Sequence, residues 1–184
     1  MESFTKAIGS NMKTMLFVPL SEYEGTIIDI VKEFSNKRIC YVTLNKTANS
    51  LRQSLKKAGV LTDNIIFIDC ISASLHDNPL QTRNTYIVHK PSSLIGISDA
   101  VIKLLDKELF DYLVFDSLTD LLAYEKKKSI YLVIAPIIER LKKLKTQVMF
   151  IVKVREQDEL IRDCAKYMDK VMLTRRGANT QILI

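Results

Sequence analysis

The sequence predicts a three-layer α/β/α protein in which helices cover both faces of a mostly parallel β-sheet. Its apolar runs of strand length lack polar alternation, which is typical of strands buried on both faces. Amphipathic stretches of helical period separate these runs. Residues 169–184 read as two short strands around a turn at 177–179, so we expect a C-terminal antiparallel hairpin at one sheet edge. The length of 184 residues suits one domain over residues 1–184.

The individual elements follow from local patterns. The predicted strands are rich in β-branched and aromatic residues and cover 13–20, 38–45, 64–71, 85–90, 111–118 and 147–154. The predicted helices have apolar residues three or four apart and cover 22–35, 47–59, 92–105, 129–145 and 157–168. Thr47 is the expected N-cap of the second helix, and Gly59 is its expected stop. The polar stretch 72–84, interrupted by Pro79, reads as a loop.

Two compositional features bound the class of protein. No apolar run approaches the ~18 residues of a membrane span, and MESFTKAIGSNMK lacks the apolar segment of a secretion signal; we therefore expect a cytoplasmic protein. Cys40, Cys70 and Cys164 are widely spaced and are expected in the core. His76 and His89 add no pair at ligand spacing, so we expect no metal site and no cofactor.

The end of the first predicted strand, VPLSEYEGTIIDIV, is where a phosphate loop would lie. Such a loop has the pattern G-x-x-x-x-G-K-[ST], with glycines for close backbone approach and a lysine for charge. With Thr26 aligned to the hydroxyl, Gly25 stands in the lysine position. Pro19 and Glu24 stand in the two glycine positions, and Glu22 adds a second negative charge. We expect this loop not to hold a triphosphate.

A second strand end, YLVFDSLTDLL, stops at Asp116 and Ser117 and continues as a helix. Together with YVTLNKTANSLRQSLKKAGV and NIIFIDCIS, it resembles the RecA superfamily, and the KaiC-like branch in particular. HKPSSLIGISDAVIKLL followed by FDYLVFDSLTDLLAYE is similar to a group of archaeal KaiC-related domains. The resemblance covers about residues 13 to 175. It implies a RecA-like sheet with Asp116 in the magnesium-associated position.

The chain departs from that family where catalysis would take place. KaiC-like ATPases carry acidic catalytic residues just after strand two, and Asn45 and Lys46 stand there instead. An amide and a cation cannot orient an attacking water as a carboxylate does, so ATP hydrolysis is not expected. Asp116 is interpreted as a helix cap or a remnant that shapes its loop. The degenerate nucleotide-site positions are then Ser21, Thr26, Asn45, Asp116 and Ser117.

Two other groups of polar residues are candidates for binding. A basic surface for nucleic acid would use Lys142, Lys143, Lys145, Arg175 and Arg176. A solvated helix face is the favoured interpretation of these residues, because the interleaved aromatics of a single-strand binder are absent. His76, Asp77 and Arg83 lie in the 72–84 loop near a strand end, where a small-molecule site would be sought first.

The resemblance implies a non-catalytic pseudo-ATPase domain that acts as a protein-interaction or regulatory module in signal transduction. Its expected partner is a protein, either a second copy of itself or an active KaiC/RecA-like relative. Two alternatives stay open. One is a DNA-associated accessory factor similar to the recombinase paralogues, and the other is a divergent nucleotide-binding protein that uses Thr26 and Asp116.

Overall fold

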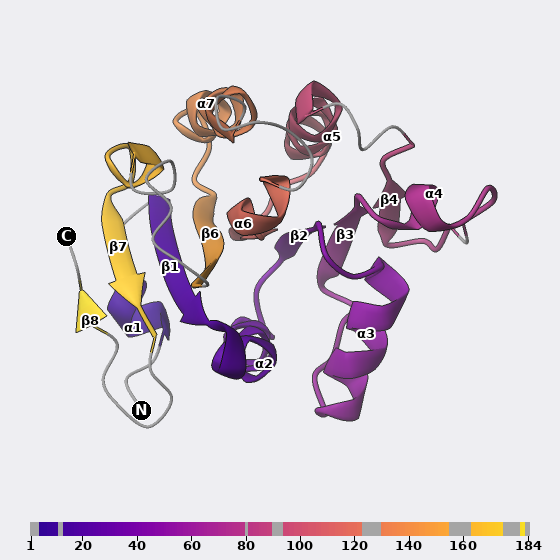
Figure 1. The fold of residues 1–184 in the computed structure, drawn as a ribbon, viewed down its shortest axis with the longest axis horizontal. Coiled ribbons are helices and arrows are strands. Elements are labelled where there is room, and N and C mark those ends of the chain that lie inside the picture. The colour runs from indigo at the N-terminus through magenta and orange to yellow at the C-terminus, as the bar shows by residue number, and fades with distance from the viewer. Residues whose placement is uncertain are drawn as a thin grey trace.

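A single β-sheet runs through the molecule, with helices on both of its faces (Figure 1). The computed structural model describes residues 4–10, 13–79, 81–89, 94–122, 130–154, 163–174 and 181–182. Within these residues the strand order is β4-β3-β2-β5-β6-β1-β7-β8. The bounds of the strands are β1 Lys13–Pro19, β2 Ile39–Thr43, β3 Ile65–Asp69, β4 Thr85–Ile87, β5 Tyr112–Asp116, β6 Gln147–Val154, β7 Lys170–Leu173 and β8 Gln181–Ile182. All pairs from β4 to β7 are parallel, which confirms the predicted sheet.

The helices divide between the two faces of the sheet, and each group encloses its own core. Their bounds are α1 Phe4–Ile8, the 3-10 helix η1 Leu20–Glu22, α2 Tyr23–Glu33, α3 Ala48–Lys57, α4 Ser72–Leu75, α5 Leu94–Lys107, α6 Leu118–Leu121 and α7 Ile130–Leu141. On one face, α1, α2 and α3 pack their apolar residues against the sheet. On the other face, α5, α6 and α7 do the same (Figure 1). The central strands β2, β3 and β5 are therefore buried on both sides, as their apolar sequences require.

Local signals place most element boundaries correctly. The hydroxyl of Thr47 accepts a hydrogen bond from the backbone N–H of Ser50 at 3.2 Å, so it caps α3 as predicted. Gly59 has a φ of +77°, a left-handed conformation that ends the helix at little cost because glycine has no Cβ. Half of the predicted helix over 157–168, residues 157–162, lies outside the described residues.

The structure corrects two sequence expectations. The stretch 72–84 is not wholly loop, because Ser72–Leu75 forms α4 directly after β3. The expected terminal pair does not add two antiparallel strands, because β7 runs parallel to β1 and only β8 is antiparallel. The turn predicted at 177–179 lies outside the described residues, and the complete hairpin stays a prediction.

Two further expectations concern the cysteines and the possibility of a membrane-spanning helix. All three cysteines are buried free thiols, which confirms them as core residues. Among the described helices, none combines the length and apolar character that crossing a membrane requires.

Candidate functional site

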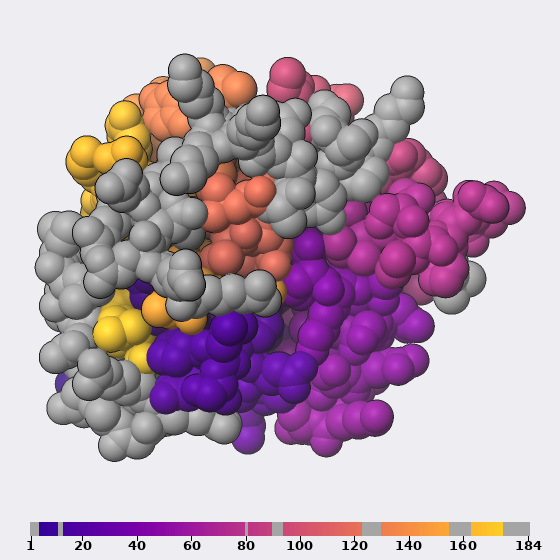
Figure 2. Space-filling view, in the orientation of Figure 1, coloured from indigo at the N-terminus to yellow at the C-terminus, as the bar shows by residue number. Residues whose placement is uncertain are grey.

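Three strands end at the same level on the carboxyl edge of the sheet. Thr43 in β2 is in register with both Asp69 in β3 and Asp116 in β5. The chain also passes from β1 through η1 into α2 at this edge, which places Tyr23 near Asp116. Open α/β sheets bind ligands at such an edge. In Figure 2, residues of α2 (indigo), of the segment after β2 (purple) and of α6 (coral) meet on the visible face.

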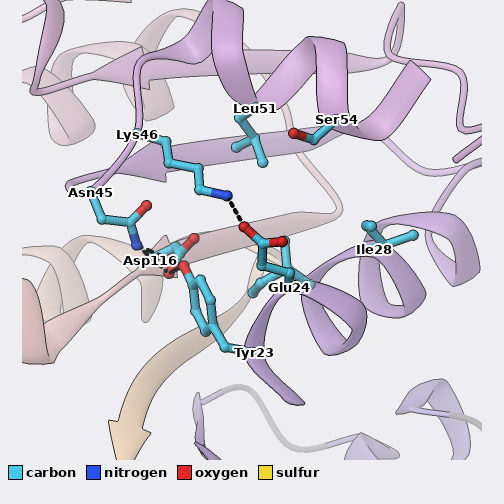
Figure 3. A pocket seen from close by; sticks show the side chains of 9 residues that line it. Tyr23, Glu24, Ile28, Asn45, Lys46, Leu51, Ser54 and Asp116 are labelled. Carbon is cyan, nitrogen blue, oxygen red and sulfur yellow. Dashed lines mark hydrogen bonds and ion pairs between the residues drawn. The ribbon is translucent and has the colours of Figure 1, made fainter. Parts of the chain in front are cut away.

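The carboxylate of Asp116 is buried, and hydrogen-bond donors of the protein itself occupy it. One oxygen, Oδ1, accepts a short hydrogen bond from the hydroxyl of Tyr23. The other, Oδ2, accepts from the hydroxyl of Tyr41 at 2.6 Å. The side-chain amide of Asn45 lies 3.5 Å from Oδ1 (Figure 3). Asp116 is only 2% exposed, so neither oxygen is presented to solvent. We call Tyr23, Tyr41, Asn45, Asp116 and Asp120 the Asp116 site.

Burial sets the protonation behaviour of this site. It raises the pKa of Asp116 to about 6, although the hydrogen bonds from Tyr23 and Tyr41 and the charge of Lys153 act in the opposite direction. Burial, and then the negative charge of Asp116, raise the pKa of both tyrosine hydroxyls well above the usual value. Both hydroxyls therefore stay protonated at neutral pH and donate to an Asp116 that is mostly ionised.

A second layer of polar contacts fixes the ring of Tyr23. Lys153 Nζ lies 4.6 Å from the centre of that ring and pairs with Asp120 Oδ2 at 2.8 Å. The amide of Asn45 donates to the Tyr23 hydroxyl oxygen at 2.7 Å and to Asp120 Oδ2 at 3.2 Å. Ser117, not Asp116, is the N-cap of α6, since its hydroxyl accepts from the backbone N–H of Asp120. The expected capping role thus belongs to the neighbour of Asp116.

An ion pair between Lys46 and Glu24 lies across the small pocket that leads to Asp116 (Figure 3). The hydrogen bond and the charge of Lys46 lower the pKa of Glu24. The cavity volume is about 30 Å³, which holds about two water molecules. Pockets for small organic ligands measure about 300–1,000 Å³, so this pocket is too small for a nucleotide. Its lining residues are Tyr23, Glu24, Ile27, Ile28, Asn45, Lys46, Leu51, Ser54 and Asp116.

The residues predicted from the sequence fall into two groups. Asn45, Asp116 and Ser117 come together at the end of β5. Ser21 is exposed in η1 and Thr26 is buried in α2, and neither lines the pocket.

Four members of the site or its support were not predicted from the sequence: Tyr23, Tyr41, Asp120 and Lys153. Two of them carried a usable signal. Lys153 interrupts the apolar run QVMFIVKV, and a charge in a buried strand requires a partner. Tyr41 lies in a strand whose five residues are all buried, where a hydroxyl normally finds an acceptor.

The other predicted polar groups do not join this site. Lys142, Lys143 and Lys145 are exposed at the end of α7, whereas Arg175 and Arg176 lie outside the described residues. His76, Asp77 and Arg83 are exposed, and none of them lines a described pocket. Within the described part of the chain, no group of three or more His, Cys, Asp or Glu residues is placed to hold a metal ion.

Replacing Tyr23 with phenylalanine tests the hydrogen bond that occupies Asp116. We expect Tyr23→Phe to lower the free energy of unfolding by about 2 kcal/mol at neutral pH, because a hydrogen bond to a charged group contributes roughly 1.5–3 kcal/mol. Urea denaturation measures this loss, with the exposed Tyr131→Phe as the matched control. Equal stabilities of the two variants would contradict a buried contact between Tyr23 and Asp116.

Comparison with known proteins identifies the fold. No protein-family model and no curated protein sequence matches the chain. A KaiC-like protein, PH0186 of Pyrococcus horikoshii, is 12% identical with a TM-score of 0.62, over 94% of this chain and 79% of that one. An uncharacterized P. horikoshii protein, PH0321, solved in complex with an unknown peptide, is 13% identical with a TM-score of 0.69, over 100% and 89%. The flagellar accessory protein FlaH of Methanocaldococcus jannaschii is 10% identical with a TM-score of 0.65, over 99% and 84%. At these identities the similarity shows a RecA/KaiC-like fold.

Proposed function

We propose that this chain is a RecA/KaiC-like domain that does not hydrolyse ATP and acts as a protein-interaction or regulatory module. The observation that supports this proposal most strongly is the occupation of Asp116. Both oxygens of the carboxylate in the magnesium-associated position accept hydrogen bonds from tyrosine hydroxyls of the same chain. Each oxygen of this buried carboxylate already accepts a hydrogen bond from within the protein, which disfavours contact with a magnesium ion or its bound water.

The connection between β1 and α2 supports the same proposal. It consists of the three-residue 3-10 helix Leu20–Glu22, and α2 then begins at Tyr23. A phosphate loop needs glycines, a lysine and exposed backbone N–H groups around the phosphates. Here an aromatic ring and the carboxylate of Glu24 lie at the start of the helix, and Lys46 pairs with that carboxylate. We infer a degenerate phosphate loop whose space is taken up by side chains of the protein.

A protein partner fits the proposal better than a small substrate. The pocket at Asp116 holds little more than water. One protein of similar fold was solved with a bound unknown peptide, and another is a flagellar accessory protein. We propose that this chain likewise binds a protein, either a second copy of itself or an active KaiC/RecA-like relative.

Calorimetric titration with Mg-ATP and Mg-ADP tests the loss of nucleotide binding. We expect no binding heat and no thermal stabilisation at millimolar nucleotide, both for the unmodified chain and for Asp116→Ala. Micromolar binding that disappears in Asp116→Ala would overturn the proposal, and would make the chain a divergent nucleotide-binding protein.

A further inference from the structure

A groove runs along α7 at the end of the sheet where the parallel strands begin. The Asp116 site lies at the opposite end, where these strands finish. Two cavities of about 430 Å³ and about 300 Å³ share Lys13, Ile138, Lys142 and Asp169 in their linings. Lys13 is the first residue of β1, which places the groove at the edge where the parallel strands begin. Both volumes fall in the range of about 300–1,000 Å³ that ligand pockets occupy. We call this feature the α7 groove.

One wall of the α7 groove is a ridge of a helix. Tyr131, Ala135, Ile138 and Lys142 follow one another at intervals of four, three and four residues, so they form a single stripe along and just beyond α7. From Tyr131 to the end of α7 at Leu141 the stripe is about 15 Å long, at 1.5 Å per residue. The small side chain of Ala135 leaves room for close approach, and such ridges pack against a second helix.

The apolar residues of the groove are of the types that anchor interfaces. Tyr131 and Tyr167 pack against each other with ring centres 5.1 Å apart, and they are 46% and 48% exposed. Ile138, Met168 and Leu144 supply further apolar surface in the lining of the two cavities. Tyrosine and methionine are enriched in interfaces, because they bury a large area and leave a polar or adaptable group at the contact.

The charge around the groove is predominantly positive. Three lysines of the region, Lys13, Lys142 and Lys166, pair with Asp169, Glu139 and Asp163. Lys143 and Lys145 flank Leu144 at the end of α7, are exposed, and form no ion pair with any acidic residue that the structure describes. Neither lysine lines either of the two cavities, but as chain neighbours of the lining residues Lys142 and Leu144 they add two cations at this end of the groove, which we call its rim. An acidic partner would complement this rim.

We propose that the α7 groove binds an acidic amphipathic helix of a partner protein. The apolar face of that helix packs over the Tyr131–Tyr167 pair and along Ala135 and Ile138, while its carboxylates face the rim lysines. This is the helix-in-groove mode of recognition. The inference rests on the proposed function as an interaction module, and it names the surface and the class of partner.

A peptide selection followed by binding measurements tests the groove. Random peptides of about 12 residues, long enough to cover a 15 Å wall as a helix, are displayed on phage and selected on the full chain. The selected peptides are then synthesised with a fluorophore and titrated by fluorescence anisotropy. Tyr131→Glu is compared with Leu132→Glu, because Leu132 is 57% exposed on the same helix but does not line the groove. Lys143→Glu with Lys145→Glu is compared with Lys56→Glu with Lys57→Glu, which change α3 on the other face.

We expect acidic peptides with apolar residues three and four apart. Their affinity should fall at least about tenfold, the loss expected for an interface anchor, in Tyr131→Glu and in the Lys143/Lys145 variant. Each matched control should stay within about twofold. Circular dichroism and the thermal midpoint identify any variant that fails to fold.

Three results would overturn the inference: selection of no acidic amphipathic peptide, equal losses in the groove variants and their controls, or salt-dependent binding of a DNA oligonucleotide to this surface in place of peptide. Because the groove and Asp116 lie on opposite edges of the sheet, the nucleotide titration distinguishes the two proposals. A chain that binds acidic peptide and Mg-ATP keeps the groove and loses the proposed function. A chain that binds neither keeps the closed nucleotide site and loses the groove.

Discussion

Asp116→Asn is expected to raise the free energy of unfolding by about 3 kcal/mol at slightly alkaline pH, and by less than about 1 kcal/mol near pH 4. The variant retains a side chain of nearly the same shape that can accept from one tyrosine hydroxyl and donate to the other. It removes the buried charge. The gain in stability should therefore follow the ionisation of Asp116 and not the loss of a contact.

The sign of this effect follows from the pKa of Asp116. Burial raises it from 3.8 in the unfolded chain to about 6 in the folded protein. Between these values the folded protein binds a proton that the unfolded chain has released, so the stability contribution of Asp116 decreases as pH rises. The decrease is complete above about pH 6, and at 1.36 kcal/mol per pKa unit it amounts to about 3 kcal/mol.

Urea denaturation of both proteins from about pH 4 to pH 8 measures this difference, the range over which the ionisation of Asp116 changes stability. The two stability curves should diverge as pH rises through the interval between the two pKa values. Carboxyl groups that do not interact with Asp116 contribute equally to both curves, so the subtraction isolates Asp116 together with its interaction with Asp120. Parallel curves would show that Asp116 ionises as freely in the folded protein as in the unfolded chain, and would contradict its burial against the tyrosines.

Asp69→Ala should cause the largest loss of stability, about 4 kcal/mol. The Asp69 carboxylate is buried and accepts four hydrogen bonds: from the backbone N–H groups of Ala48 at 2.6 Å, Ile71 at 2.9 Å and Ser72 at 2.8 Å, and from the Ser72 hydroxyl at 2.7 Å. Removing it leaves these donors without an acceptor, at a cost of roughly 1–3 kcal/mol for each group that stays buried. The Asp69 carboxylate also joins the start of α3 to the start of α4, so the substitution should loosen both helix ends.

The geometry predicts a graded series at this position. In Asp69→Asn, one oxygen still accepts from Ile71 and Ser72, but an amide nitrogen faces the N–H of Ala48, so about half of the loss is expected. Asp77→Ala, at an exposed position after α4, is the control and should change stability by less than about 0.5 kcal/mol. Chemical denaturation of the three variants checks the order. A loss in Asp69→Ala no larger than in Asp77→Ala would contradict the role of Asp69 as a shared cap.

Much of the fold can be predicted because its signals are local. The strands are apolar on both faces, and the α3 boundaries follow from Thr47 and Gly59, whose roles depend on neighbours a few residues away. The helix α4 escapes detection because four residues are too few for a helical period, and because Asp69, which caps it, lies in the preceding strand. The direction of β7 depends on its pairing with β1, more than 150 residues earlier in the chain, and no local pattern determines it.

At the Asp116 site, too, the local features follow from the sequence and the long-range contacts do not. The position of Asp116 at a strand end follows from the sequence, as does the absence of a phosphate-loop lysine. The occupation of Asp116 by the hydroxyls of Tyr23 and Tyr41, which closes the site, does not follow from the sequence. The two tyrosines lie 93 and 75 residues away from Asp116 in the chain. Tyr23 alone reads as an ordinary apolar residue of its helix, and the position of Tyr41 in a buried strand indicates that its hydroxyl needs an acceptor without indicating which one. Only the fold brings both hydroxyls to one carboxylate.

The most direct test of the closed site is a carbon-13 NMR titration of the Asp116 side-chain carboxyl, with and without millimolar Mg-ADP, assigned by comparison with Asp116→Asn. We expect a single titration near pH 6 that the nucleotide leaves unchanged, because tyrosine hydroxyls already donate to both oxygens. A fall of this pKa on addition of Mg-ADP would mean that a cation reaches the carboxylate. That result would contradict the closed site and restore nucleotide binding as a function of this chain.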